Sequence, residues 1–173
     1  MTLTTRPDHF LYFAYGSNMC VGRLNVPERA PSAAVICSAY VAGRRLTFDK
    51  ASKDGSAKCD CEYTGNATDR VYGVVFEIHA SDKAALDRAE GKGYGYDALD
   101  IEVTAPTGPA VMLTYIATNK KAGLRPYDWY KQHVIDGASA ANLPGDYISM
   151  ITAVESIPDS DDARSARENA IRC

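Results

Sequence analysis

The sequence predicts an α+β protein in which a mixed β-sheet or small β-barrel is flanked by helices. Strand-like segments come first along the chain, one helix interrupts them, two more strands follow, and the remainder is helical. This order lacks the regular alternation of strand and helix that produces a doubly wound parallel sheet. A chain of 173 residues with ordinary composition is expected to form one domain over residues 1–173. Its core would cover about residues 9–157, with a peripheral helix or frayed tail over residues 158–173.

Runs of β-branched, aromatic and small apolar residues between turn residues predict seven strands. We expect the strand at 59–63 to pair with the strand at 71–78, because the turn-forming sequence TGNATD joins them. The polar stretch KASKDGSAK is expected to be a mobile loop. The predicted strands cover about residues 9–14, 31–43, 45–48, 59–63, 71–78, 99–105 and 110–117.

Capping residues and apolar spacing predict three helices. In SDKAALDRAEG, Ser81 is placed to cap the start of a helix and Gly91 to end it. The segment RPYDWYKQHVIDGA predicts a second helix with Pro126 near its first turn. A third helix is expected to open near Asn142. Its core-facing side chains would be Tyr147, Ile148, Ile151 and Val154.

Charge and hydropathy exclude several classes of partner. The net charge of −3 and the pI of about 5.6 give no basic surface for nucleic acid or an anionic membrane. No apolar run approaches the roughly 20 residues of a membrane span. The start, MTLTTRPDHF, lacks the basic-then-apolar order of a signal peptide. We therefore expect a cytoplasmic protein with no nucleic-acid or membrane partner.

The cysteines indicate reduced thiols. Their number, five, cannot all pair within one chain, and disulfides are rare in the cytosol. Cys59 and Cys61 alternate along a predicted strand and share one face. His9, His79 and His133 show no spacing typical of a zinc site, so no structural metal is expected.

Two segments carry polar residues that a core does not require. YFAYGSNM, residues 12–19, runs from a strand into a tight turn in which Gly16 permits a close backbone path. The helix over 81–91 ends at Glu90, although the helix dipole disfavours a carboxylate there. Taken alone, these are a surface turn and a solvated glutamate. The glycines of AEGKGYGY do not form a phosphate loop, because such loops open a helix whereas these close one.

Taken together and in this order, YFAYGSNM, VYGVVFEI, LDRAEG, LTYIATN and LPGDYI resemble the γ-glutamylcyclotransferase family. The resemblance extends from about residue 10 to about residue 157. It implies that Glu90 is the general acid/base and that the segment 12–19 cradles the substrate. It also implies that Tyr94 or Tyr96 shapes the pocket wall. The implied substrate-binding residues are Tyr12, Phe13, Ala14, Tyr15, Gly16, Ser17, Asn18 and Tyr115.

The resemblance implies an intramolecular aminolysis. The α-amino group of a γ-glutamyl compound attacks its own γ-carbonyl, and 5-oxoproline leaves together with the free amino acid or amine. Such a lyase-type reaction needs no metal and no organic cofactor, and the partner is a small γ-glutamyl molecule. The sequence leaves open whether the protein is a monomer or a homodimer.

Two other functions and the choice of substrate also stay open. A non-catalytic module that binds a γ-glutamyl ligand could keep the same pocket, although an intact Glu90 argues against it. An amidohydrolase could use Ser17 or Cys20 as nucleophile, but no histidine is placed to activate either. The segments 50–58 and 91–100 are expected to border the leaving group. Substrate choice among γ-glutamyl dipeptides, γ-glutamylamines, glutathione and γ-glutamyl natural products would be made there.

Overall fold

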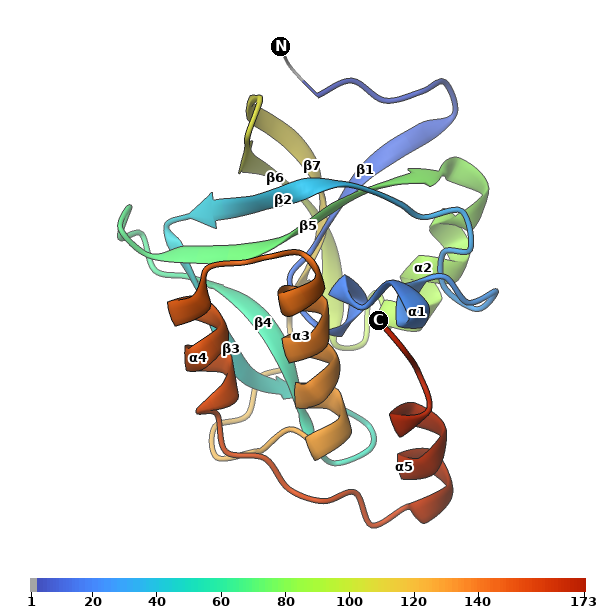
Figure 1. The fold of residues 1–173 in the computed structure, drawn as a ribbon, viewed down its shortest axis with the longest axis vertical. Helices are drawn as coiled ribbons and strands as arrows, with labels where there is room; N and C mark the ends of the chain where they lie inside the picture. The colour runs from blue at the N-terminus through green and yellow to red at the C-terminus, as the bar shows by residue number, and fades with distance from the viewer. Residues whose placement is uncertain (1–2) are drawn as a thin grey trace.

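The computed structural model describes residues 3–173 and contains a closed five-stranded β-barrel beside a two-stranded sheet (Figure 1). Around the barrel the strands follow the order β1, β5, β2, β6, β7, while β3 pairs with β4. This architecture confirms the predicted α+β class. The strands are β1 His9–Ala14, β2 Ala34–Ala42, β3 Arg44–Ala51, β4 Ala57–Tyr63, β5 Arg70–His79, β6 Tyr96–Ala105 and β7 Gly108–Ala117. The helices are α1 Val21–Leu24, α2 Lys83–Glu90, α3 Asp128–Ala140, α4 Gly145–Thr152 and α5 Asp162–Asn169, with 3₁₀ turns η1 Ser17–Met19 and η2 Ala80–Asp82.

Strand β1 is the part of the barrel that positions the segment 12–19. It pairs antiparallel with β5, where Tyr12 lies opposite Phe76, and parallel with β7, where Tyr12 lies opposite Leu113. Its first half is half-buried, whereas residues 12–14 are buried. The polar turn therefore begins inside the molecule rather than at its surface.

The hairpin of β3 and β4 corrects one predicted pairing. The strand at 59–63 pairs with β3, so that Leu46 lies opposite Cys61, and not with the strand at 71–78. Both edges of β5 are occupied, one by β1 and the other by β2. A strand has only two hydrogen-bonding edges, so β5 has none left for β4.

The polar stretch 50–58 forms the turn of this hairpin, residues 52–56, together with the strand ends on either side. β3 continues to Ala51 and β4 begins at Ala57. In the turn between them, Asp54 accepts hydrogen bonds from Ser56 Oγ (2.7 Å) and Lys58 Nζ (2.9 Å). These local hydrogen bonds order the turn, although its sequence contains no apolar residue that would pack in the core.

Helix α2 begins later than the sequence predicted. Ser81 lies inside the 3₁₀ turn η2 and donates its N–H to the ring of His79 at 3.2 Å, so Ser81 is not the N-cap of α2. The other end lies where it was predicted. Gly91 has φ +67°, a left-handed conformation that favours glycine and ends a helix. Glu90 is therefore the last residue of α2.

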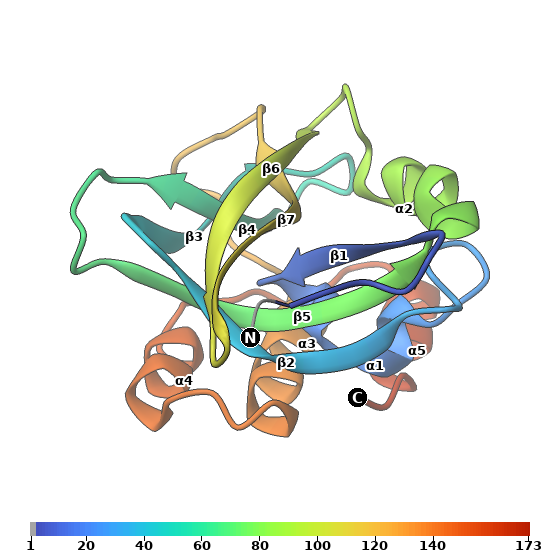
Figure 2. The same ribbon diagram turned by 90° about the horizontal axis from the view of Figure 1, so that it is seen from above.

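Helices α3 and α4 lie side by side against the part of the barrel that contains β2 and β5 (Figures 1 and 2). α3 also packs against η1 at a point where only glycine fits. A Cβ on Gly137 would lie 2.7 Å from the backbone nitrogen of Cys20 and 2.7 Å from the carbonyl carbon of Met19. Gly137 thereby allows α3 to support the segment 12–19 closely.

We expect Gly137→Ala to lower the free energy of unfolding by about 1–3 kcal/mol, because the added methyl meets backbone that cannot move aside. Chemical denaturation measures this change. The matched control is Gly145→Ala at the start of α4, where an added Cβ meets nothing within 4 Å. That control should change the free energy by no more than about 1 kcal/mol. Equal effects of the two substitutions would contradict the close approach.

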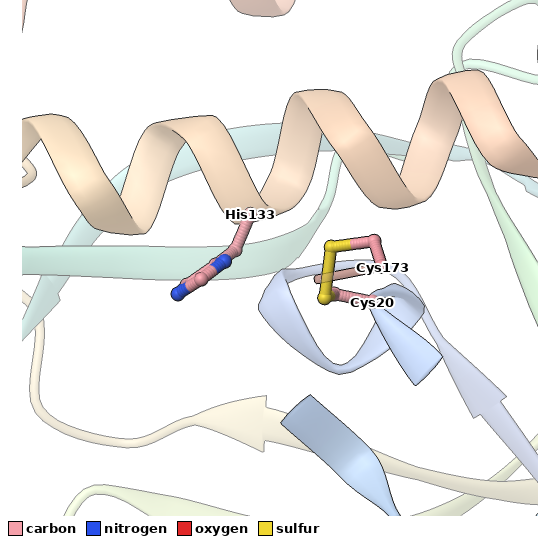
Figure 3. Close-up of side chains that lie close together, drawn as sticks. All are labelled: Cys20, His133 and Cys173. Atoms are coloured by element: carbon pink, nitrogen blue, oxygen red, sulfur yellow. A yellow bond between two sulfur atoms is a disulfide. The ribbon is translucent and has the colours of Figure 1, made fainter. Parts of the chain in front are cut away.

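The segment after residue 158 contains α5 and is bonded to the rest of the chain. Asp159 accepts a hydrogen bond from Trp129 Nε1 (2.8 Å) and pairs with Arg164 (2.6 Å). The last residue, Cys173, forms a disulfide with Cys20, and the C-terminus accordingly lies beside α1 (Figures 1 and 3). The prediction of reduced thiols is therefore wrong for this pair. An odd number of cysteines leaves one or more unpaired but does not say which.

Three cysteines are free: Cys37, Cys59 and Cys61. No helix within residues 3–173 combines the length and the apolar character needed to cross a membrane.

Candidate active site

Beyond β1, the chain turns through Gly16 into η1, and this turn is tightly packed. A Cβ on Gly16 would lie 3.2 Å from Cys59 Cβ and 3.3 Å from the hydroxyl of Tyr130. Ser17 and Asn18, which follow, are both buried. No hydrogen bond among residues 3–173 uses the backbone N–H of Gly16, Ser17 or Asn18 as donor. The turn therefore offers backbone donors that are free for a bound molecule.

Helix α2 places the carboxylate of Glu90 against this turn. Asn18 Nδ2 donates a hydrogen bond to Glu90 Oε1. The same nitrogen also donates to the hydroxyl oxygen of Tyr12, which lies 3.0 Å away. Arg29 Nη1 lies 3.3 Å from Asn18 Oδ1 and 3.7 Å from Glu90 Oε1. The Glu90 side chain is only 14% exposed. A solvated surface glutamate, the alternative that the sequence left open, does not describe this residue.

The turn and Glu90 line a small cavity of about 40 Å³. Two of its walls come from segments to which the sequence gave no site role: Cys59 on β4 and Tyr130 on α3. Tyr130 accepts a hydrogen bond at its hydroxyl from the N–H of Cys59 (3.0 Å), which joins these walls. The lining residues are Tyr12, Tyr15, Gly16, Ser17, Asn18, Cys59, Glu90, Tyr96, Tyr115 and Tyr130.

Three residues named from the sequence do not line this cavity. Phe13 and Ala14 are buried in the hydrophobic core, Phe13 with no exposed surface. Side chains alternate between the two faces of a strand, so Phe13 points away from the face that carries Tyr12. Tyr94 is 81% exposed and borders a separate, outer hollow, whereas Tyr96 lines the cavity.

The tyrosines of the cavity act through hydrogen bonds rather than as bases. Burial raises the pKa of Tyr12, and the nearby Glu90 carboxylate raises it further. Burial and a hydrogen bond to Asp87 raise the pKa of Tyr115, whose hydroxyl donates to Asp87 Oδ1 at 2.6 Å. Tyr15 donates to the carbonyl of Tyr115 at 2.5 Å. These groups stay protonated near neutral pH and fix the shape of the cavity.

Two carboxylates lie near the end of α2, and they have different surroundings. Asp87 binds Lys83 Nζ at 2.5 Å and the Tyr115 hydroxyl. Burial opposes ionisation of Asp87, but these hydrogen bonds hold its pKa below the ordinary value. Asp87 is therefore a charged group that orients Tyr115. Glu90 is the carboxylate that faces the cavity.

The thiols and the hydroxyl near the cavity lack an activating base. Burial raises the pKa of Cys59 to about 12, so this thiol is not ionised near neutral pH. Cys20 is bonded to Cys173. Ser17 Oγ accepts a hydrogen bond from Arg23 Nε at 3.1 Å, and Arg23 cannot act as a base.

A single group of possible metal ligands is found within residues 3–173: Cys20, His133 and Cys173, whose ligand atoms lie within 4.8 Å of one another (Figure 3). Both sulfur atoms belong to the disulfide, so neither is a thiolate ligand in this state. His133 instead contacts Glu168 at 3.2 Å.

Comparisons with known proteins agree on one family. The sequence model of a family described as AIG2-like matches residues 70–151. The human protein named gamma-glutamylcyclotransferase is 33% identical over 161 residues, covering 87% of this chain and 82% of that protein. The mouse protein of the same name is 32% identical, covering 86% and 80%. A solved structure described as gamma-glutamyl cyclotransferase superposes with a TM-score of 0.80 at 27% identity, covering 94% and 99% of the two chains.

The match to the human relative is above 30% identity over most of this chain, and the similar structure shares the fold over nearly the whole chain. The chain therefore belongs to the γ-glutamylcyclotransferase family.

Proposed function

We propose that this protein converts a γ-glutamyl amino acid or amine into 5-oxoproline and the free amino acid or amine, with Glu90 as general acid/base. One observation carries the proposal: Glu90 lines the same cavity as the segment 12–19, and its carboxylate is oriented there by Asn18. The names of the relatives point to the same activity.

In the first step, the lone pair of the neutral α-amino nitrogen attacks the γ-carbonyl carbon and closes a five-membered ring. Glu90 accepts the proton that this nitrogen loses as the new C–N bond forms. In the second step, the protonated Glu90 carboxyl gives that proton to the departing nitrogen as the original amide C–N bond breaks. No water is consumed, and the carboxylate is regenerated. Because nucleophile and electrophile belong to one molecule, the protein gains most by holding the glutamyl chain curled.

The segment 12–19 is the proposed holder of that chain. Its backbone N–H groups at Gly16, Ser17 and Asn18 donate to no other group among residues 3–173. They are suited to the substrate α-carboxylate or to the oxyanion that develops on the γ-carbonyl. The hydroxyls of Tyr12 and Tyr115 complete the polar wall on the side of Glu90. The reaction requires no metal and no organic cofactor.

We further propose that the protein acts in the cytosol and is a monomer or a homodimer. The disulfide bears on the first of these, because cytosolic thiols are generally kept reduced. Mass spectrometry of the protein from its own cells, with free thiols blocked before lysis, would report whether Cys20 and Cys173 are joined there.

The activity is tested by incubating purified protein with γ-glutamylalanine, γ-glutamylethylamine, Nε-γ-glutamyl-lysine and glutathione in ¹⁸O-labelled water. We expect unlabelled 5-oxoproline from at least one compound, because cyclisation takes no oxygen from water. Labelled glutamate would instead indicate hydrolysis by an amidohydrolase. Binding without either product, detected by calorimetry, would indicate a non-catalytic module. Incubation without protein controls for spontaneous cyclisation.

A further inference from the structure

Glu90 borders two larger hollows in addition to the small cavity described above. One has a volume of about 260 Å³ and the other about 320 Å³. The cavity of about 40 Å³, where the γ-glutamyl part would be held, adjoins them: it shares Ser17, Glu90, Tyr96 and Tyr130 with the hollow of about 260 Å³ and Glu90 with the other. Any group beyond the scissile amide therefore extends into a hollow. Both hollows share the residues Lys50, Ser52, Ala89 and Glu90.

The hollow of about 260 Å³ is lined by several cations, and most are already paired. Lys50 is the exception: no carboxylate lies within 4.0 Å of its ammonium among residues 3–173, and Arg29 is 3.7 Å from Glu90 itself. The other cations pair as Arg23 with Glu168, Lys58 with Asp54, and Arg164 with Asp159.

Lys50 is held in place rather than extended into solvent. It lies on β3 and is half-buried, and its ammonium is 4.8 Å from the centroid of the Tyr96 ring. Gly95 makes room for it, because a Cβ there would lie 2.7 Å from Lys50 Cε and 2.8 Å from Nζ. Burial lowers the pKa of Lys50, and the carboxylates of Glu90 and Asp54, which lie beyond ion-pair distance, offset this only in part. A bound anion would replace the missing interaction.

We propose that Lys50 binds the carboxylate of the departing amino acid and is the residue that makes γ-glutamyl amino acids better substrates than γ-glutamyl amines. This inference rests on the proposed function. Lys50 fits the role because it lines both hollows together with Glu90 and is half-buried without an ion-pair partner among residues 3–173. Lys53 and Arg88, which also lack an ion pair there, are exposed and line only the hollow of about 320 Å³. A leaving group without a carboxylate cannot form an ion pair with the Lys50 ammonium.

The test compares two substrates that differ only by that carboxylate: γ-glutamylalanine and γ-glutamylethylamine. In the wild type we expect a higher kcat/KM for γ-glutamylalanine. In Lys50→Met, the ratio of the two kcat/KM values should fall by about ten- to hundredfold, the range for loss of a charged hydrogen bond. Lys50→Arg keeps the charge and should restore most of the ratio.

Lys53→Met is the matched control. Lys53 borders the hollow of about 320 Å³ and forms no ion pair among residues 3–173, but it is exposed and lies over the exposed ring of Tyr94. Its ammonium is screened by solvent, so its loss should change the ratio by less than about threefold. If the ratio of the two kcat/KM values falls equally in Lys50→Met and Lys53→Met, the effect comes from the net positive charge of the region and not from Lys50. That result would overturn the inference.

Other outcomes are equally decisive. If Lys50→Met lowers kcat/KM equally for both substrates, Lys50 contacts the shared glutamyl part and the inference is wrong, while the proposed function stands. A wild type that prefers γ-glutamylethylamine would also overturn it. If the wild type forms no 5-oxoproline from any compound, the proposed function fails first and the inference fails with it.

Discussion

Glu90→Gln is expected to lower kcat for 5-oxoproline formation by about 10²–10⁴-fold, the contribution typical of a positioned proton carrier. Glutamine keeps the size of glutamate and an oxygen that accepts the Asn18 hydrogen bond, but its amide cannot take a proton from the substrate amine. The fold should therefore persist while the chemistry stops. Steady-state release of 5-oxoproline measures kcat, and the melting temperature reports the fold.

Asp87→Asn tests whether the loss belongs to Glu90 or to any carboxylate at the end of α2. Asp87 lies outside the cavity lining and contacts Lys83, Lys92 and the Tyr115 hydroxyl. It acts through Tyr115, so its substitution should cost at most about tenfold, the loss of one hydrogen bond. A larger loss for Asp87→Asn than for Glu90→Gln would reassign the proton carrier. Activity of Glu90→Gln within a few fold of wild type would remove Glu90 from the mechanism.

Cys173→Ser is expected to lower the free energy of unfolding by about 2–5 kcal/mol. The disulfide closes a loop with a sequence separation of 153, and so large a loop restricts the unfolded chain strongly. Substitution at Cys173, which is exposed, avoids placing a hydroxyl at the fully buried Cys20. Urea denaturation without reductant measures the change.

Wild-type protein treated with reductant should fall to the stability of Cys173→Ser, and reductant should have no further effect on the variant. Cys37→Ser is the control, because Cys37 is half-buried and unpaired. Its unfolding should stay sensitive to reductant, as in the wild type. A wild type whose stability is the same with and without reductant would show that the bond does not form in solution.

The elements were predictable from the sequence, but their pairing was less so. Alternation of apolar residues located β4, because it depends only on the residues of β4 itself. Its partner depended on which edges were already occupied, and both edges of β5 are taken by strands distant in sequence. Similarly, capping chemistry at Ser81 suggested a helix start, whereas the imidazole of His79 binds the Ser81 N–H and favours a 3₁₀ turn.

The site was predictable where it is continuous in sequence. The turn after β1 and the end of α2 carry unusual residues in short segments, and the resemblance to a family linked them. Cys59 and Tyr130 carried no such signal, because each lies in an ordinary strand or helix and reaches the site only through the fold. Lys50 lies in the segment 50–58 that was expected to border the leaving group, but nothing in that segment singled out this residue. The disulfide was missed for a related reason: its cysteines are 153 residues apart, and the assumed compartment argued against pairing.

The bond between Cys20 and Cys173 also gives the molecule an unusual connectivity. The disulfide closes the chain from Cys20 to Cys173 into a covalent ring. Strand β1 precedes Cys20 and is therefore outside this ring, but it pairs with two strands of the ring, β5 and β7. A protease that cuts once inside the ring, for example at the turn 52–56, opens the circle without releasing a fragment. The nicked protein would migrate as one species on a non-reducing gel and as two pieces on a reducing one.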